Sequence, residues 1–65
     1  MTNIDIFEEI FWTVADELGL TAWYELFDSE DMDEVDRRVA LHFGVEDATE
    51  VEGYSDWYNE MAWEL

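Results

Sequence analysis

The stretch NIDIFEEIFWTVADEL, residues 3–18, decides the fold that the sequence predicts. Its apolar residues recur at three- and four-residue spacing, which is the period of one face of an α-helix. They are Ile4, Phe7, Phe11, Val14 and Leu18, with Ile10 beside them. Thr2 or Asn3 can cap the first turn, and Gly19 fits the left-handed position at which many helices end. We therefore expect an amphipathic helix over residues 3–18.

Three shorter segments follow this helix. Residues 21–27 favour a short helix, although their aromatic content is also compatible with a strand. Residues 31–43 show helical spacing again, and Gly44 can end that helix. In residues 48–65 a glycine at position 53 interrupts the pattern, so we expect a short turn followed by a terminal helix.

These elements predict a mainly α fold, a compact bundle of three to four short helices with an aromatic core. The chain has 65 residues, which is too few for two independent cores, so residues 1–65 are expected to form a single acidic domain. Val39, Leu41, Phe43 and Val45 alternate as strand residues do. The alternative is therefore a small α/β fold with a short hairpin around residues 39–54.

Charge is the dominant feature of the composition. Nineteen Asp and Glu residues face only two basic residues, Arg37 and Arg38, and the formal net charge is −17. A chain with this charge would be suspected of disorder. However, 49% of the residues are hydrophobic and 17% are aromatic, which is far more than acidic disordered tails contain. We therefore expect a folded domain with a strongly anionic surface.

The sequence gives little support for catalysis, metal binding or direct contact with nucleic acid. Its only histidine is His42, and it has no cysteine, so a nucleophile with an activating base is not expected. No carboxylate spacing fits an EF-hand loop. Ala40 and Gly44 could begin a helix-turn-helix, but no Lys or Arg follows Val45. We predict no enzyme activity, no cofactor, no metal site and no direct nucleic-acid binding.

The segment DSEDMDEVDRR, residues 28–38, has carboxylates at six of its first nine positions. Helical spacing can pair Asp33 with Arg37 and Glu34 with Arg38. On a helix that rises ~1.5 Å per residue, this segment offers about one charge per 2.2 Å, against one per ~1.7 Å in duplex DNA. The partner-binding residues that we predict are Asp28, Glu30, Asp31, Asp33, Glu34, Asp36, Glu46, Asp47, Glu50, Glu52, Asp56 and Glu60.

In size and composition the chain resembles the small acidic DNA-mimic proteins of phages and mobile elements, which include anti-restriction and anti-CRISPR proteins. The resemblance rests on no alignable motif. It implies an inhibitor that occupies the basic DNA-binding channel of a host defence complex. The leading hypothesis is an anti-CRISPR protein that blocks target-DNA binding by a CRISPR effector, for example a type I surveillance complex.

Several further expectations accompany that hypothesis. The protein would be a monomer or weak dimer. We expect it in the cytoplasm of an infected bacterial host, because neither a signal peptide nor a membrane-spanning run is recognisable. One alternative is an anti-restriction protein or another DNA-mimic inhibitor of a DNA-binding protein. The other is an acidic protein-interaction or antitoxin-like module, which would hold its partner through exposed aromatic residues such as Trp12 or Tyr24.

Overall fold

The computed structural model describes residues 2–27 and 29–64. Over these residues the chain forms four α-helices, one 3-10 turn and no strand. The helices are α1 (Asn3–Leu18), α2 (Trp23–Phe27), α3 (Met32–Phe43) and α4 (Tyr54–Glu64), and the 3-10 turn is η1 (Ala48–Glu50). The mainly α prediction is confirmed. The alternative hairpin around residues 39–54 is wrong, because that segment holds the end of α3, η1 and the start of α4.

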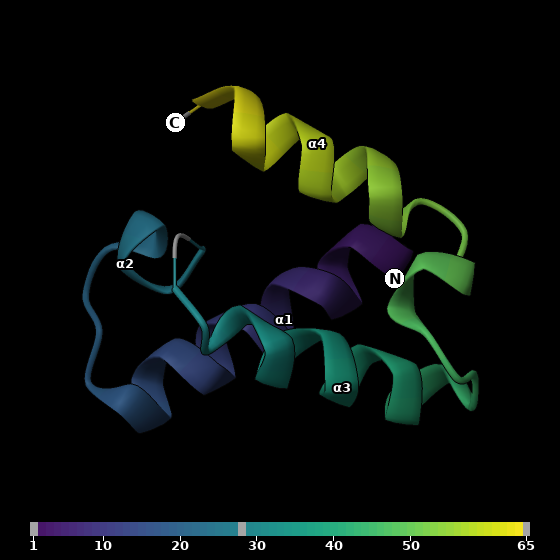
Figure 1. The fold of residues 1–65 in the computed structure, drawn as a ribbon, viewed down its shortest axis with the longest axis horizontal. Helices are drawn as coiled ribbons and strands as arrows, with labels where there is room; N and C mark the ends of the chain where they lie inside the picture. The colour runs from purple at the N-terminus through teal and green to yellow at the C-terminus, as the bar shows by residue number, and fades with distance from the viewer. Residues whose placement is uncertain (1, 28, 65) are drawn as a thin grey trace.

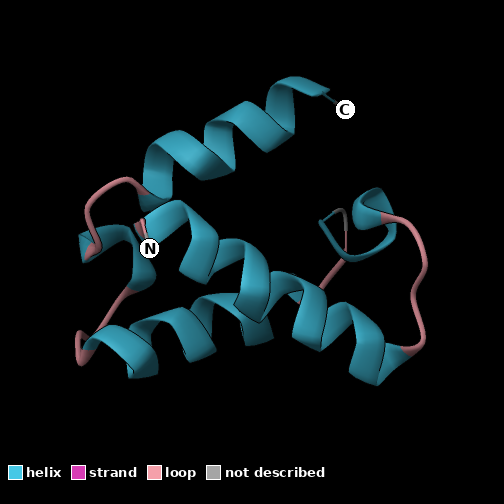
Figure 2. Cartoon of the chain, turned by 180° about the vertical axis from the view of Figure 1, so that it is seen from behind, coloured by secondary structure: helices cyan, strands magenta, loops and turns pink. Residues whose placement is uncertain are grey.

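Helix α1 is the central element of the fold. It contacts α2, α3 and α4, and in both views it lies between α3 and α4 (Figures 1 and 2). The Thr2 hydroxyl accepts a hydrogen bond from the backbone N–H of Asp5, and the Asp5 carboxylate accepts one from the N–H of Thr2. At the other end Gly19 is left-handed, with φ of 74°. The predicted start and end of this helix are both confirmed.

The buried face of α1 is shorter than the sequence pattern indicated. Phe7, Phe11 and Val14 are buried as expected, and Ile10 is partly buried. The two ends of the predicted stripe are exposed, at 44% for Ile4 and 46% for Leu18. The other helices cover only the middle turns of α1, so the ends of its apolar face remain in contact with solvent.

The turn after α3 brings the acidic residues 46–50 beside the acidic residues of α3 itself. Met32, Val35 and Val39 are buried at helical spacing. Leu41 is 67% exposed, so the alternating residues that favoured a strand do not share one face. The N–H of Val45 donates to the carbonyl of Ala40 at 3.0 Å, which turns the chain back along α3. Residues 46–50 are thereby placed against this helix.

The core is built around the ring of Phe7, which is fully buried. Its centroid lies 5.9 Å from that of Phe43, 5.1 Å from Tyr54 and 5.5 Å from Trp57. The rings of Phe7 and Tyr54 meet edge to face, a geometry that aromatic pairs favour. Residues from α1, α3 and α4 therefore meet at one aromatic cluster, as the sequence predicted.

Candidate protein-binding surface

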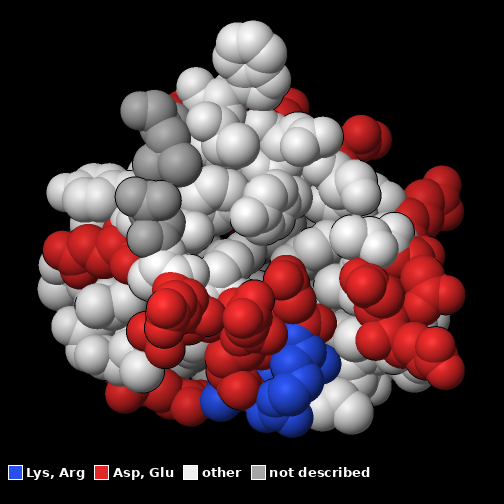
Figure 3. All heavy atoms as spheres, viewed as in Figure 1, with Lys and Arg blue, Asp and Glu red and all other residues white. Residues whose placement is uncertain are grey.

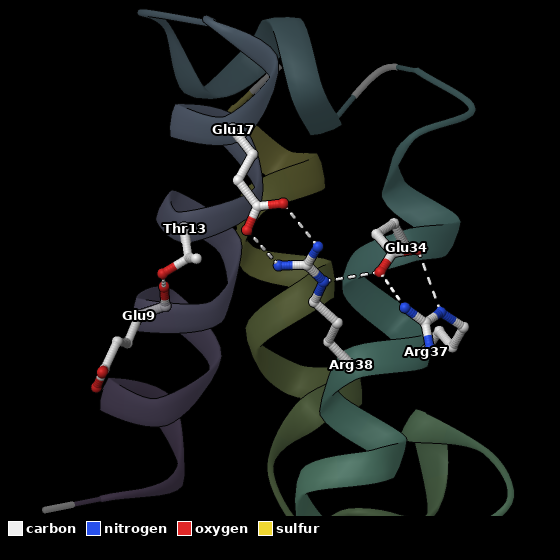
Figure 4. A network of polar contacts seen from close by, with 6 residues as sticks. All are labelled: Glu9, Thr13, Glu17, Glu34, Arg37 and Arg38. Carbon is white, nitrogen blue, oxygen red and sulfur yellow. Dashed lines mark hydrogen bonds and ion pairs between the residues drawn. The ribbon is translucent and has the colours of Figure 1, made fainter.

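Both arginines belong to one ion-pair network that joins α1 to α3 (Figure 4). Arg38 donates two hydrogen bonds to the Glu17 carboxylate, from Nη1 at 2.7 Å and from Nη2 at 2.8 Å. Its Nε donates to Glu34 at 2.7 Å. Arg37 donates to the same Glu34 carboxylate, with Nε at 3.2 Å. The chain's only two basic residues are therefore already bound to its own carboxylates.

This network lowers the pKa values of both of its carboxylates. Hydrogen bonds from Arg37 and Arg38 lower the pKa of Glu34 to about 2, and the hydrogen bond from Arg38 lowers the pKa of Glu17. The predicted pairing of Glu34 with Arg38 is confirmed. The predicted pairing of Asp33 with Arg37 is wrong, because Arg37 turns to Glu34 instead. As a result, the Asp33 carboxylate stays exposed and is not neutralised by either arginine.

An acidic groove of about 430 Å³ lies between α3 and the segment that precedes and includes the start of η1. We use "acidic groove" for the site formed by Asp33, Asp36, Glu46 and Asp47, with Arg37 beside them. These four carboxylates are among the predicted partner-binding residues, and they come from two segments that the turn at Gly44 folds together. The structure thus brings one third of the predicted residues into a single concave site.

Two carboxylates of the acidic groove also have structural roles. The Tyr54 hydroxyl donates to Asp36, whose pKa is raised by burial despite that bond, with Asp33 and Asp47 adding repulsion. Asp47 caps η1 by accepting hydrogen bonds from the N–H and hydroxyl of Thr49, which lower its pKa. Asp33 and Glu46 are exposed and carry no such role in the described structure. They are the groove carboxylates that are free to meet a partner.

The other predicted residues lie outside this groove. Glu34 is occupied by the arginines, and Glu50 accepts a hydrogen bond from the backbone N–H of Asp47. The following predicted residues are exposed in the turn before α3, on the loop after η1 or on α4: Glu30, Asp31, Glu52, Asp56 and Glu60. Asp28 lies outside the described residues. Figure 3 shows acidic side chains over α3 and over the segment between α3 and α4, while the surface above, over α4, is mostly uncharged.

Exposed aromatic residues form a second feature of the surface. Trp12 is 44% exposed and Tyr24 is 54% exposed, in agreement with the two positions that the sequence singled out. Trp63 is 88% exposed and was missed. Helical spacing offered the signal, since Trp57 and Met61 face the core four residues apart and Trp63 falls off that face. Sequence reasoning also missed Glu17 and Tyr54, because their bonds link segments far apart in the chain.

The described residues also bear on two other kinds of site. No group of three or more His, Asp or Glu side chains within residues 2–27 and 29–64 is arranged so that it could hold a metal ion. None of the described helices has the length and apolar character needed to cross a membrane. No protein-family model matches the chain, and no curated protein or solved structure is significantly similar to it. Its function must therefore be inferred from its own residues.

Proposed function

We propose that the protein is a DNA mimic, which binds the basic DNA-binding channel of another protein and excludes DNA from it. The observation that carries this proposal is the ion-pair network. Arg37 is bound to Glu34, and Arg38 is bound to both Glu17 and Glu34, so no basic side chain remains to balance the carboxylates on the rest of the described surface. The acidic groove and the exposed acids around it present that charge to a partner.

The amount of charge matches that of a duplex of the same length. The longest dimension of the described structure is 27 Å. At one charge per ~1.7 Å of axis, 27 Å of duplex DNA carries about 16 charges, and the formal net charge of the chain is −17. A basic channel attracts such a partner over long distances and releases counterions on binding it. The same charge opposes direct binding of the protein to nucleic acid.

As the particular target we propose the DNA-binding channel of a CRISPR effector, such as a type I surveillance complex, in the cytoplasm of an infected bacterium. The class resemblance to anti-CRISPR proteins supports this choice. Restriction enzymes and other DNA-binding proteins have channels with the same chemistry, and the experiment below distinguishes them from CRISPR effectors by identifying the captured protein.

The test is capture of partners from bacterial lysate on the immobilised protein at low salt, with identification by mass spectrometry. The proposal predicts recovery of a DNA-binding complex that competing duplex DNA releases. It also predicts that affinity falls roughly tenfold or more between 50 and 200 mM salt, since each neutralised charge adds to the salt dependence. A partner that resists both salt and DNA would overturn the proposal.

A matched pair of variants locates the contact. Asp33→Asn/Glu46→Gln/Glu52→Gln removes three exposed carboxylates, two in the acidic groove and one on the loop after η1, and none of these side chains bonds to another described residue. Glu9→Gln/Asp16→Asn/Glu25→Gln removes the same charge from α1 and α2. We expect the first variant to lose about tenfold in affinity for the captured partner and the second about twofold or less. Equal losses would show that only net charge matters.

A second candidate function is an acidic interaction module that holds its partner through apolar contacts. The exposure of Trp63, Leu41 and Tyr24 favours it, at 88%, 67% and 54%. Such an interface would be nearly insensitive to salt and would weaken in a Trp63→Ala variant. The salt series described above therefore separates the two candidates with the same captured partner.

A further inference from the structure

An aromatic groove, separate from the acidic groove, lies where α1, α2 and α4 meet. It has a volume of about 170 Å³, and one tryptophan from each of these helices lines it. Its lining residues are Glu8, Phe11, Trp12, Trp23, Trp57, Met61 and Glu64. Phe11 and Trp57 are buried and form its base, with ring centroids 6.1 Å apart in an edge-to-face arrangement. Trp12, Glu8 and Glu64 are exposed at its edge.

The chemistry of this lining selects a cation with a flat shape. Among aromatic side chains, the indole face of tryptophan attracts cations most strongly. The two glutamates at the edge add negative charge, and no basic side chain lines the groove to compete with an entering cation. The guanidinium of arginine is planar, stacks on aromatic faces and is more weakly hydrated than the ammonium of lysine. The aromatic groove therefore complements arginine better than lysine or an uncharged group.

We propose that the aromatic groove binds an arginine side chain of the partner protein. This inference rests on the proposed function and adds a named contact to it, because proteins that bind DNA commonly hold phosphate groups with arginine. One arginine of the partner's basic surface would enter the groove that Trp12 and Trp23 line and meet Glu8 and Glu64. The exposed carboxylates elsewhere would supply attraction over distance, and the aromatic groove would supply a contact that depends on shape.

The test uses short peptides and requires neither the partner nor DNA. The probe is a six-residue peptide of alternating arginine and glycine, compared with the same peptide containing lysine or citrulline in place of arginine. Citrulline keeps the shape of arginine but has no charge. Binding is followed by NMR through the indole N–H signals of the tryptophans, assigned with single Trp→Phe variants. Trp63 does not line the groove and serves as the internal reference.

We expect the arginine peptide to shift the Trp12 and Trp23 signals saturably, with affinity about fivefold or more above that of the lysine peptide. The citrulline peptide should leave both signals unmoved. Equal shifts with arginine and lysine, or signals that respond to neither peptide, would overturn the inference. Stronger shifts at Trp63 than at Trp12 would do the same, because binding would then lie elsewhere on the surface.

Matched variants separate the groove from general charge. Glu8→Gln/Glu64→Gln should lower affinity for the arginine peptide about fivefold, and Trp12→Leu should do so to a similar extent. Trp12 is 44% exposed, so this variant keeps the core. The control Glu9→Gln/Asp16→Asn removes the same charge from α1 outside the groove and should change affinity twofold or less. A loss in the control equal to that in the groove variant would overturn the inference.

The outcome of this experiment can be distinguished from a failure of the proposed function. If the indole signals do not respond while duplex DNA still releases the captured partner, the groove inference is wrong and the DNA-mimic proposal stands. If the arginine peptide binds the groove but the partner ignores DNA, the groove inference stands and the DNA-mimic proposal is wrong.

Discussion

Asp36 differs from most carboxylates of this chain because it is partly buried. Its side chain accepts a hydrogen bond from the Tyr54 hydroxyl. Burial and the hydrogen bond to the Asp36 carboxylate raise the pKa of Tyr54 well above its usual value, so the phenol remains a donor even in alkaline solution. This bond crosses from α4 to α3, and it compensates in part for the burial of a charge.

The Tyr54→Phe substitution tests that compensation. It keeps the buried ring but removes the donor, so the Asp36 carboxylate would be left partly desolvated without its partner. We expect the free energy of unfolding to fall by about 0.5–1.5 kcal/mol, measured by urea denaturation at pH 7. The control is the substitution Tyr58→Phe, at a tyrosine that is 37% exposed. An unchanged free energy for Tyr54→Phe would mean that the bond contributes nothing in solution.

Two groups with opposite pKa shifts predict how stability depends on pH. The raised pKa of Asp36 means that the folded state binds this proton more readily than the unfolded state, so stability rises as pH falls through the folded-state pKa towards the ordinary value of 3.8. The pKa of Glu34 is lowered from 4.5 to about 2, so the stability that it provides is lost as pH falls through this interval. Glu17 and Asp47 have lowered values and act in the same direction as Glu34.

We therefore expect the free energy of unfolding to pass through a maximum on the acidic side of neutral and to fall below about pH 4.5. Thermal unfolding followed at pH 7, 5 and 3 measures this. Asp36→Asn should flatten the rise that precedes this maximum and leave the loss at lower pH intact. A wild-type stability that falls steadily from pH 7 to 5 would contradict the assignment to Asp36.

At the scale of the elements, local sequence signals predicted where most of the helices begin and end. Thr2 caps α1, and Gly19 and Gly44 end α1 and α3 in the left-handed conformation, as the sequence indicated. The weak prediction was the choice between helix and strand around Leu41, because short apolar runs fit both periods. Helix is favoured there because Met32, Val35 and Val39 all reach the core from one face, whereas a strand would bury only alternate residues.

The turn that folds the two halves of the acidic groove together depends on the left-handed conformation of Gly44, and this dependence can be tested. Gly44 has φ of 70°, and a Cβ at this position would meet nothing within 4 Å, so the cost of alanine is purely conformational. We expect Gly44→Ala to lower the free energy of unfolding by about 1–2 kcal/mol, and Gly44→Asn by less. Leu41→Ala, at a position that is 67% exposed, is the control. Chemical denaturation measures all three, and equal stability of Gly44→Ala and wild type would contradict the prediction.

At the scale of the whole molecule, the sequence predicted the charge but not its arrangement. Asp33, Asp36, Glu46 and Asp47 were all named as candidate residues, yet nothing in their spacing showed that they would face one groove. That proximity depends on the turn at Gly44 and on packing between distant segments. For the same reason the aromatic groove could not be predicted, because its tryptophans come from three helices.

Self-repulsion should make the stability of the entire fold depend on salt. At 0.01 M salt the Debye length of ~30 Å exceeds the 27 Å length of the molecule, so all of its charges interact. At 0.15 M salt the Debye length is ~8 Å, and only neighbouring charges still interact. We expect the midpoint of thermal unfolding at pH 7 to rise over this range, as calorimetry or circular dichroism would show. Screening of the ion-pair network acts in the opposite direction but involves only four residues. A flat or falling midpoint would contradict dominant repulsion.

The adjacent positions of Arg37 and Arg38 have one more consequence. The chain contains no lysine, so a trypsin-like protease, which cuts after Arg or Lys, finds its only cleavable bonds after these two residues. Both bonds lie inside α3, where the backbone is helical and the side chains are held by Glu17 and Glu34. Cleavage therefore requires α3 to open. When opening and closing are fast relative to cleavage, the rate of cleavage is proportional to the fraction of molecules in which α3 is open. Limited digestion at these two neighbouring bonds would therefore report the opening of one helix.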